Sequence, residues 1–482
     1  GLLMPTTSVG AMLNRATLMT GKTVVNLNYT ASVDALRSAI EKAEIQTIYT
    51  AKLFISKLKA KGVDTDEILG SSKVVYLEEL KNDISKLNGI RTFLMARLLP
   101  VFLIKLMYIK KVPNDEVATI LFSSGSEGEP KGVMLTHRNV MSNVKQIADV
   151  LNMHEKDVIL ASLPLFHAFG LTATTWLPLL EGIPMVAHPD PTDAVGVGKA
   201  VAKFQATVMF GTSTFFRLYA KNKKVHPLMM DSLRLTVAGA EKLSPEVKLA
   251  FEEKFHRTIL EGYGLTESAP VASVNLPDVL ETETFTVQVS TRVGSVGMPL
   301  PGTSFKIVDP NSYAELDIDE DGLILIAGPQ VMKGYLKDES KTVEVMHEQD
   351  GVRWYKTGDK GHIDADGYLY IIDRYSRFAK LGGEMISLTT IESEIEKFIN
   401  NSEIDLLVVN LPDDKKGEKI ILLIQGYDKS SDLKKALVDS GMQPLSIPSQ
   451  IYDVEKIPKL GTGKNDFAGA KKLALELQDA GE

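Results

Sequence analysis

Short apolar runs alternate with helical patterns along residues 1–300, and this alternation limits the fold more than any other feature of the sequence. Runs rich in β-branched and aromatic side chains predict strands, and the longer segments between them have apolar residues at helical spacing. The pattern predicts an α/β fold in which helices cover β-sheets. The predicted strands are 22–28, 46–50, 73–77, 118–122, 158–164, 184–188, 207–211 and 234–239.

Two of the segments between strands, 32–45 and 244–255, begin with a serine. A serine hydroxyl can accept hydrogen bonds from the free N–H groups of a first helical turn, so we expect a helix in each segment. Pro245 falls at the first helical position of the second segment, where its missing N–H costs nothing.

The pattern changes near residue 293 and again near 374–378. A chain of 482 residues is too long for one compact core, so such changes mark domain boundaries. We predict a domain at 1–375, containing a small β subdomain at about 293–375, and a second domain at 376–482. The elements expected after residue 293 are strands at 305–311, 322–328 and 361–373, a loop at 380–387, a helix at 388–400, strands at 404–410 and 419–425, a helix near 432, and a tail at 455–467.

The composition excludes several classes of site. The chain has no cysteine, which excludes disulfides, thiolate nucleophiles and cysteine-ligated metals and is compatible with a reducing cytoplasm. A formal net charge of −8 argues against broad nucleic-acid binding. The sequence opens GLLMPTTSVGAML, with neither an initiator Met nor the pattern of a signal peptide, so we expect it to be the inside of a larger protein.

The segment 90–111 raises the question of a membrane. Its apolar run is broken by Arg97, Pro100 and Lys105, which argues against a spanning helix. Basic residues among Leu, Phe and Met suit an amphipathic helix on an anionic membrane surface. The alternative is a helix packed on the domain core with a solvated basic edge. The basic residues are Arg91, Arg97, Lys105, Lys110 and Lys111.

A glycine- and serine-rich loop follows the predicted strand 118–122, in the stretch 121-LFSSGSEGEPKGVMLTHRN-139. We interpret it as a loop between a strand and a helix, whose N–H groups and hydroxyls can bind phosphate. It is not a P-loop, because Lys131 lies between Pro130 and Gly132 rather than between glycine and a hydroxyl residue. Alone it could equally be a polar surface turn.

Further polar clusters follow in order. The stretch 261-EGYGLTES-268 contains an aromatic face, a hydroxyl and a carboxylate, which could stack on a base, donate to phosphate and bind Mg²⁺. In 355-YKTGDKG-361, Asp359 could accept hydrogen bonds from ribose hydroxyls. Lys464 lies in the glycine-rich stretch 459-KLGTGK-464.

The ordered set SSGSEGEPKG, PLFHAFG, GYGLTE, TGD and PKLGTGK resembles the adenylate-forming (AMP-binding) superfamily over nearly all of the chain. Together with FGTSTF, VAGAEKL, RFAKLGGEMISL and GTGKNDF, it is similar to the synthetase half of the bacterial bifunctional 2-acylglycerophosphoethanolamine acyltransferase/acyl-acyl carrier protein synthetases. The resemblance implies the adenylate-forming fold, with a large domain of helix-covered sheets and a small mobile α+β carboxy-terminal domain. It also implies ATP and Mg²⁺, and an upstream first portion of the domain preceded by an acyltransferase.

By this resemblance the loop at 123–131 would hold the β- and γ-phosphates of ATP. Glu127 departs from the family, which commonly has a hydroxyl residue there, and an acid beside triphosphate is repulsive, so we leave it out of the site. The residues implied are Ser123, Ser124, Gly125, Ser126, Gly128 and Lys131.

The resemblance implies three residues at the reacting phosphate. Thr266 would bind the α-phosphate, Glu267 would bind Mg²⁺, and Lys464 would bridge the incoming carboxylate and the α-phosphate as the catalytic cation. A lone lysine on a tail is otherwise usually solvated. The adenosine site would contain Gly239, Ala240, Glu241, Gly262, Tyr263, Asp359 and Arg374, with Tyr263 stacked on adenine unless it is only a core residue.

The resemblance places His167 as a gate beside the acyl channel and Arg377 at the hinge of the small domain, where relatives often have Asp or Lys. A structural, hydrogen-bonded histidine is the alternative for His167. The loop 380–387 would enter the site in the second half-reaction. Gly211, Thr212 and Phe215 would line the acyl pocket, although ordinary core residues look the same in sequence.

The activity implied is activation of a long-chain fatty acid to an acyl-adenylate and transfer to the phosphopantetheine thiol of acyl carrier protein, linked to acylation of a lysophospholipid. A long-chain fatty acid-CoA ligase and an inactive acyl- or nucleotide-binding module are the alternatives. We expect a location at the cytoplasmic side of the inner membrane, bound peripherally, or in the cytoplasm for this piece alone.

Overall fold

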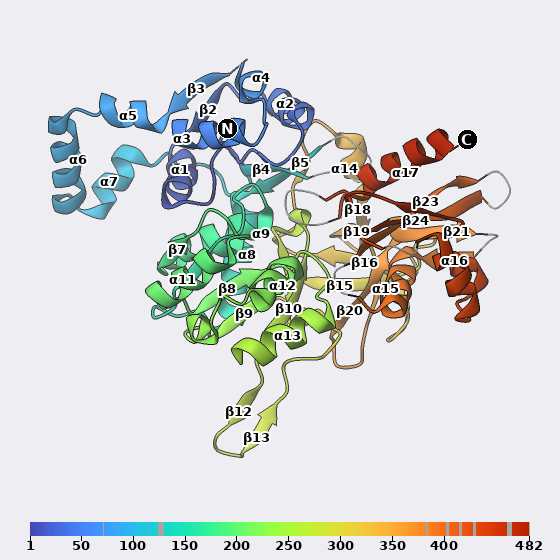
Figure 1. Cartoon of the computed structure of the whole chain (residues 1–482). Helices are drawn as coiled ribbons and strands as arrows, with labels where there is room; N and C mark the ends of the chain where they lie inside the picture. Colours follow the sequence, from blue (N-terminus) through green and yellow to red (C-terminus); the bar gives the residue numbers. More distant parts are fainter. Residues whose placement is uncertain are drawn as a thin grey trace.

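The computed structural model describes residues 1–70, 72–123, 130–381, 384–401, 404–413, 417–427, 430–459 and 465–481. A large amino-terminal domain and a smaller carboxy-terminal domain form the predicted α/β architecture (Figure 1).

The central sheet of the large domain has the strand order β14-β11-β10-β9-β8-β6-β7. The strands from β7 to β10 in this order run parallel, whereas β11 and β14 run antiparallel to their neighbours. Every residue of β6, β8 and β9 is buried, as in a parallel sheet covered on both faces. The strands are β6 (Ile159–Ala161), β7 (Met185–Ala187), β8 (Val208–Gly211), β9 (Leu235–Ala238), β10 (Ile259–Gly264), β11 (Val271–Val274) and β14 (Met298–Pro299).

Helices from both sides of this sheet contribute to one hydrophobic cluster. Fully buried examples are Val144, Val201, Phe216 and Phe251, each from a different helix. Burial on this scale is the main stabilising contribution to the large domain. The helices and helical turns around the sheet are α8 (His137–Val150), α9 (Ala168–Leu171), η1 (Thr172–Trp176), α10 (Leu177–Glu181), α11 (Ala194–Phe204), α12 (Ser213–Lys221), η2 (Pro227–Met230) and α13 (Pro245–Phe255).

A second sheet, β1-β4-β5-β17, places the glycine- and serine-rich loop differently from the prediction. The loop connects two antiparallel strands, with Ser123 opposite Lys131, and α8 begins only after the second of them. Val133 and Leu135 are fully buried, which explains why 131–136 is a strand rather than the start of a helix. The strands are β1 (Val24–Val25), β4 (Val117–Ser123), β5 (Lys131–Thr136) and β17 (Gly334–Tyr335).

Several amino-terminal elements share a small hydrophobic cluster with β1 and β4, whereas Leu13 and Leu18 of α1 pack on the main cluster, and β2 pairs with β3. Ser32 caps its helix as predicted, because its hydroxyl accepts from the Ala35 N–H at 3.2 Å. Ser244 does not cap α13 with its side chain, so that prediction is wrong. The elements are α1 (Ser8–Met19), α2 (Val33–Lys42), β2 (Thr47–Thr50), α3 (Lys52–Ala60), α4 (Thr65–Leu69), β3 (Lys73–Tyr76) and α5 (Leu77–Asp83).

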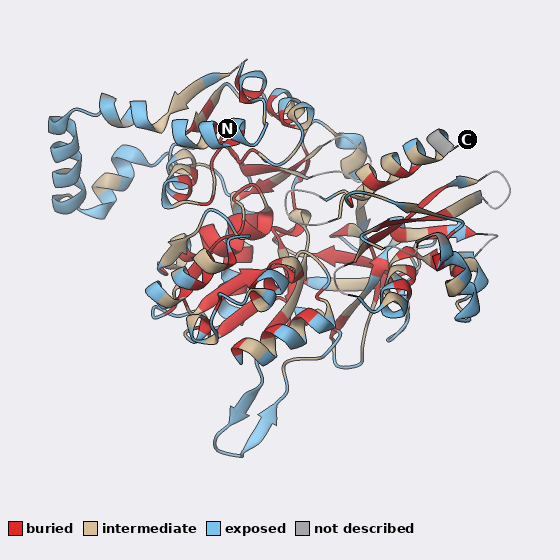
Figure 2. Ribbon diagram, viewed as in Figure 1, coloured by how far each residue is buried: buried red, intermediate tan, exposed pale blue. Residues whose placement is uncertain are grey.

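Residues 86–108 form two helices, α6 (Lys86–Leu98) and α7 (Val101–Tyr108), that project from this lobe (Figure 1). Neither helix has a buried residue, so the interpretation of this segment as a helix packed on the core is wrong (Figure 2). Among the described residues, no helix is both long enough and apolar enough to cross a membrane.

The predicted β subdomain is a sheet of order β15-β16-β19-β18, with β20 paired to β19. The strands predicted at 305–311 and 322–328 are present, whereas 361–373 covers the end of β19, a turn and most of β20. The strands and nearby elements are β12 (Val279–Glu281), β13 (Thr286–Gln288), β15 (Ser304–Val308), β16 (Gly322–Ala327), α14 (Glu339–Val345), β18 (Met346–Gln349), β19 (Val352–Ile363) and β20 (Leu369–Arg374).

The carboxy-terminal domain is a sheet covered on both faces. In β23, Leu406 and Val408 face one hydrophobic cluster, and Leu407 and Val409 face another. Of the segment 380–387, predicted as a loop, the described residues belong to the paired strands β21 and β22, and α17 was not predicted. The elements are η4 (Tyr375–Arg377), β21 (Phe378–Leu381), β22 (Glu384–Ser387), α15 (Leu388–Ile399), β23 (Asp405–Asp413), β24 (Gly417–Gln425), α16 (Ser430–Asp439), η5 (Pro444–Ser446), β25 (Gln450–Asp453) and α17 (Phe467–Gly481).

Candidate active site

The carboxyl ends of β8, β9 and β10 bring predicted site residues together. Gly211 ends β8, Gly239 follows β9, and Gly262 lies in β10. The Gly239 N–H donates to the Gly211 carbonyl at 3.1 Å, and a Cβ at Gly239 would approach the Phe169 ring to 3.3 Å. Ala240 has a φ of +72°, in the left-handed region. Backbone therefore forms this edge of the parallel sheet, the position at which open α/β sheets commonly bind ligands.

Tyr263, Asp359 and Arg374 meet in one hydrogen-bonded group. The Tyr263 hydroxyl donates to Asp359 Oδ2 at 2.5 Å, and Arg374 Nε donates to Oδ1 at 3.0 Å. The Asp359 side chain is only 3% exposed, and Arg374 faces it across the β19–β20 ladder. Burial, followed by the charge of Asp359, raises the pKa of Tyr263 well above its usual value, so the phenol remains a donor.

Glu267 lies in the short turn η3 (Thr266–Ser268), beside Thr266. The Tyr335 hydroxyl donates to Glu267 Oε1 at 2.9 Å. Burial and then the charge of Glu267 raise the pKa of Tyr335, which keeps the phenol protonated.

This donor set fits a magnesium ion that arrives with a nucleotide. Within the described ranges, no group of three or more His, Asp or Glu side chains could hold a metal ion. Mg²⁺ commonly binds through one or two carboxylates together with substrate phosphates and water. A single carboxylate held by a phenol suits that mode of binding.

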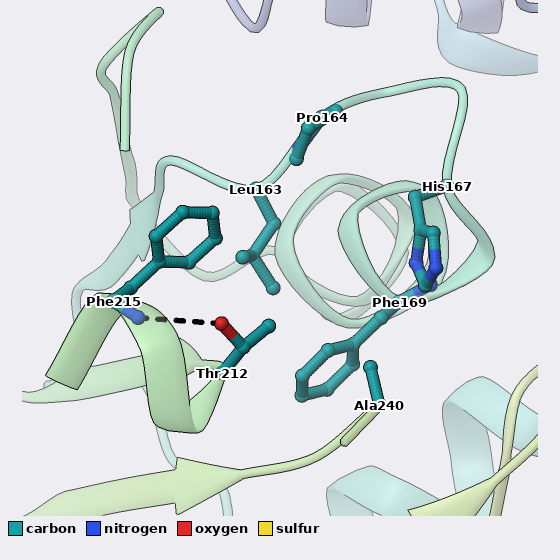
Figure 3. A pocket seen from close by; sticks show the side chains of 7 residues that line it. All are labelled: Leu163, Pro164, His167, Phe169, Thr212, Phe215 and Ala240. Carbon is teal, nitrogen blue, oxygen red and sulfur yellow. Dashed lines mark hydrogen bonds between the residues drawn. The ribbon is translucent and has the colours of Figure 1, made fainter. Parts of the chain in front are cut away.

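A small apolar pocket opens beside the same sheet edge (Figure 3). Its volume, counted with its open mouth, is about 280 Å³. Leu163, Pro164, His167, Phe169, Thr212, Phe215 and Ala240 line it. The structure thus places four predicted site residues from three segments around one space.

His167 contributes to the structure of this pocket as well as to its wall. Its Nδ1 accepts from the Phe169 N–H at 3.3 Å at the start of α9. The Thr212 hydroxyl caps α12 in a similar way, accepting from the Phe215 N–H at 3.3 Å, the dashed line of Figure 3. Both polar side chains therefore orient the backbone that surrounds the pocket.

The Glu241 carboxylate has a local partner that the sequence did not predict. It accepts from the Thr214 N–H at 2.5 Å, in the first turn of α12. A carboxylate is favourable at a helix amino terminus. We infer that Glu241 orients α12, while its backbone remains beside Ala240 at the sheet edge.

Arg377 is buried inside the carboxy-terminal domain. Its side chain is 6% exposed and donates to the Val408 carbonyl at 2.6 Å and to Glu392 Oε1 at 2.5 Å. The Phe467 ring centroid lies 4.2 Å from its guanidinium carbon, a cation–π contact. Arg377 is thus fixed to the small domain rather than placed freely between the domains.

Several predicted residues lie outside the described residues, namely Ser124, Gly125, Ser126, Gly128 and Lys464. Of the neighbouring residues also predicted to bind phosphate, Ser123 ends β4 and Lys131 begins β5. Their roles remain predictions.

The sequence interpretation missed Tyr335 and Thr357. Thr357 accepts from the Asp359 N–H at 3.0 Å and donates to the Ile324 carbonyl at 2.8 Å, so it orients the Asp359 turn. Thr357 belongs to the TGD motif and could have been included. Tyr335 is 68 residues from its partner Glu267 and has no local sequence signal.

Comparisons with family models and with curated proteins relate this chain to known enzymes. The sequence model of one family, described as AMP-binding enzyme, matches residues 1–336. A long-chain-fatty-acid–CoA ligase of Bacillus subtilis is 29% identical over 472 residues, which cover 93% of this chain and 80% of that protein. A long-chain-fatty-acid–CoA ligase of Salmonella typhimurium is 31% identical over 366 residues, which cover 75% of this chain but only 62% of that protein.

The fold has close neighbours among solved structures. The o-succinylbenzoate coenzyme A synthetase MenE of Bacillus subtilis, in complex with ATP and magnesium ion, aligns with a TM-score of 0.75 at 22% identity. The alignment covers 98% of this chain and 88% of that one. At this identity the likeness supports the fold alone.

We expect Arg377→Met to destabilise the protein by about 3–5 kcal/mol, because Glu392 would remain buried without its cation. The measurement is the urea midpoint and slope, followed by circular dichroism. The matched control is Arg138→Met, which removes an arginine from the exposed pair with Asp115, at a cost of at most about 1 kcal/mol. Equal, small losses in both variants would contradict the buried ion pair.

Proposed function

Because the chain belongs to the AMP-binding enzyme family, we propose that it activates a long-chain fatty acid with ATP and transfers the acyl group to a phosphopantetheine thiol. Family membership makes it an acyl-adenylate-forming ligase with ATP and Mg²⁺ as cofactors. The names of the curated relatives support a fatty acid as the substrate. The observation that supports this proposal most is the joining of Tyr263, Asp359 and Arg374 beside the sheet edge.

In this proposal Asp359 holds the ribose of ATP. A carboxylate has about four lone-pair positions, and Tyr263 and Arg374 use two of them. The remaining positions can accept from the two ribose hydroxyls. The base would lie against the Tyr263 ring, with the backbone of Gly239, Ala240 and Glu241 opposite.

The first half-reaction brings one anion onto another. A fatty acid carboxylate oxygen forms a bond to the α-phosphorus while the bond from that phosphorus to the bridging oxygen breaks, and pyrophosphate leaves with the electron pair. Positive charge and oriented donors must reduce the repulsion. We assign this work to Lys464, to Thr266 at the α-phosphate, and to the loop 123–131 at the β- and γ-phosphates. Bound at Glu267, Mg²⁺ would neutralise the departing pyrophosphate.

The second half-reaction forms the thioester. The thiol loses its proton and its sulfur attacks the acyl carbonyl, and AMP leaves with the electron pair of the broken anhydride bond. We propose that the small domain rotates between the two steps and brings the β21–β22 hairpin to the site. Arg377 would move with that domain, since its partners Glu392 and Val408 belong to it. The bending residues would then lie just before Arg377.

The apolar pocket between His167 and Phe215 is the proposed entrance of the acyl chain. Its lining is apolar apart from His167 and Thr212, whose Nδ1 and hydroxyl oxygen accept hydrogen bonds from the backbone. Such a wall suits an alkyl chain, which has no hydrogen-bonding groups. His167 would gate the channel by changing the direction of its ring.

We further propose acyl carrier protein as the thiol acceptor and acylation of 2-acylglycerophosphoethanolamine as the use of the product. Both follow from the motif resemblance. The relatives named above are CoA ligases, and their names instead support CoA as the acceptor. An inactive binding module is less well supported, because the sequence retains Lys464, Glu267 and Lys131.

We expect Asp359→Asn to raise the KM for ATP at least about tenfold, because the amide N–H₂ would face one of the two donors, Tyr263 or Arg374. The KM for fatty acid should change little. The assay is fatty acid-dependent exchange of labelled pyrophosphate into ATP by the full-length protein. Asp366→Asn makes the same charge change at an exposed position and should behave as wild type. An unchanged KM for ATP in Asp359→Asn would remove the ribose assignment.

We expect Lys464→Ala to lower the rate of the same exchange reaction by at least about 100-fold, because the cation between carboxylate and phosphate would be lost. ATP binding should weaken much less. Lys456→Ala removes a nearby exposed lysine as a control. Exchange at the wild-type rate in Lys464→Ala would refute its catalytic role, and no exchange by the wild-type protein would refute adenylation itself.

The acceptor is tested by supplying holo-acyl carrier protein and CoA side by side and comparing kcat/KM for thioester formation. We expect the higher value with the carrier protein. Efficient reaction with CoA alone would overturn that choice and leave fatty acid activation intact. Adding 2-acylglycerophosphoethanolamine to the full-length protein then tests whether the acyl group passes to phospholipid.

A further inference from the structure

Residues 86–111, here called the basic arm, stand apart from both domains. They contain α6 and α7, whose residues are all exposed or half-buried, and they extend from the amino-terminal lobe away from the candidate active site (Figures 1 and 2). At its base the Lys110 N–H donates to the Met19 carbonyl at 2.9 Å, which joins the returning chain to the end of α1. The arm is thus attached at its base and exposed along its length.

The basic arm exposes apolar surface that a domain normally buries. In α6, spacings of three and four residues place Leu87, Ile90, Leu94 and Leu98 along one stripe. Contiguous apolar patches of this kind are rare on soluble surfaces and mark interaction sites. The large exposed apolar residues are Leu87, Ile90, Phe93, Leu94, Leu98, Val101, Phe102, Leu106, Met107, Tyr108 and Ile109.

The charge of the basic arm is opposite to that of the whole chain. The formal net charge of the protein is −8, but the arm has six basic residues and no acidic residue. Arg91 and Arg97 lie on either side of the apolar stripe of α6. The basic residues are Lys86, Arg91, Arg97, Lys105, Lys110 and Lys111.

We propose that the basic arm binds the surface of an anionic lipid bilayer, with its apolar side chains in the interface and its basic side chains at the headgroups. The long basic side chains beside the apolar stripe can reach the headgroups while the Phe and Leu side chains enter the interface. The 13 residues of α6 are about 20 Å long, too short to span a bilayer.

A second copy of the chain is a poorer occupant of this surface. A symmetric contact between two arms places the same patch of each copy against the other. Six positive charges would then face six positive charges with no acidic residue in either arm. Anionic headgroups instead supply the complementary charge.

The test is co-sedimentation with vesicles, without ATP or fatty acid, so that its result is independent of the proposed activity. Wild-type protein should bind vesicles of phosphatidylcholine mixed with phosphatidylglycerol, bind pure phosphatidylcholine weakly, and dissociate as salt is raised. Replacing Arg91, Arg97 and Lys105 by Gln should lower the partition coefficient by on the order of 100-fold. Replacing the exposed Lys57, Lys156 and Lys223 by Gln is the control of equal charge and should have a much smaller effect.

A second pair of variants tests the apolar contribution. Replacing Phe93, Phe102 and Leu106 by Ser should abolish binding without lowering the melting temperature, because all three side chains are exposed. Phe102→Trp should show a shift of fluorescence to shorter wavelength with anionic vesicles only. If the Gln variants bind as wild type, or if the Ser variants turn a dimer into a monomer while vesicle binding persists, the lipid proposal is overturned.

Discussion

The carboxylate of Asp359 ties the central sheet to the β subdomain. It accepts hydrogen bonds from the Tyr263 hydroxyl of β10 and the Arg374 guanidinium of β20. The backbone N–H of Asp359 donates to the Thr357 hydroxyl. A buried carboxylate is costly unless it is paired and hydrogen-bonded, so these donors have to stay in place. The same requirement orders the surface on which we place ribose and base. The fold and the proposed site therefore depend on one set of hydrogen bonds.

The remaining parts of the site follow a common arrangement. Backbone at the ends of the parallel strands allows a ligand to approach closely. The polar side chains mostly form hydrogen bonds with nearby backbone or with each other. Glu241 and Thr212 cap α12, His167 orients the start of α9, and Tyr335 holds Glu267. Supporting bonds of this type fix the geometry of groups that would touch a ligand. The two polar side chains that line the apolar pocket, His167 and Thr212, therefore also hold the nearby backbone.

The sequence predicted the α/β class and most strands, because burial on both faces requires apolar runs such as 207–211 and 234–239. It failed where the signal was not local. The strand 131–136 was not predicted, because only the burial of Val133 and Leu135 in the folded protein distinguishes it from the start of a helix. The strands β21 and β22 were not predicted, because the two consecutive glycines between them in the sequence are typical of a loop. Motif order brought Tyr263 and Asp359 together correctly, but Tyr335 has no motif that points to Glu267.

The residues that are bonded to the large domain and to the small domain lie very close together in the chain, on either side of residue 375. Arg374 is bonded to Asp359 of the large domain, and Arg377 is bonded to Glu392 and Val408 of the small one. Only Tyr375 and Ser376 lie between them, and their φ and ψ angles are four soft torsions. A rotation of the small domain would also have to break the bonds from Ser387 and Thr389 to Asp373. With so few degrees of freedom, the small domain would swing as a rigid body along a narrow path instead of drifting on a flexible tether.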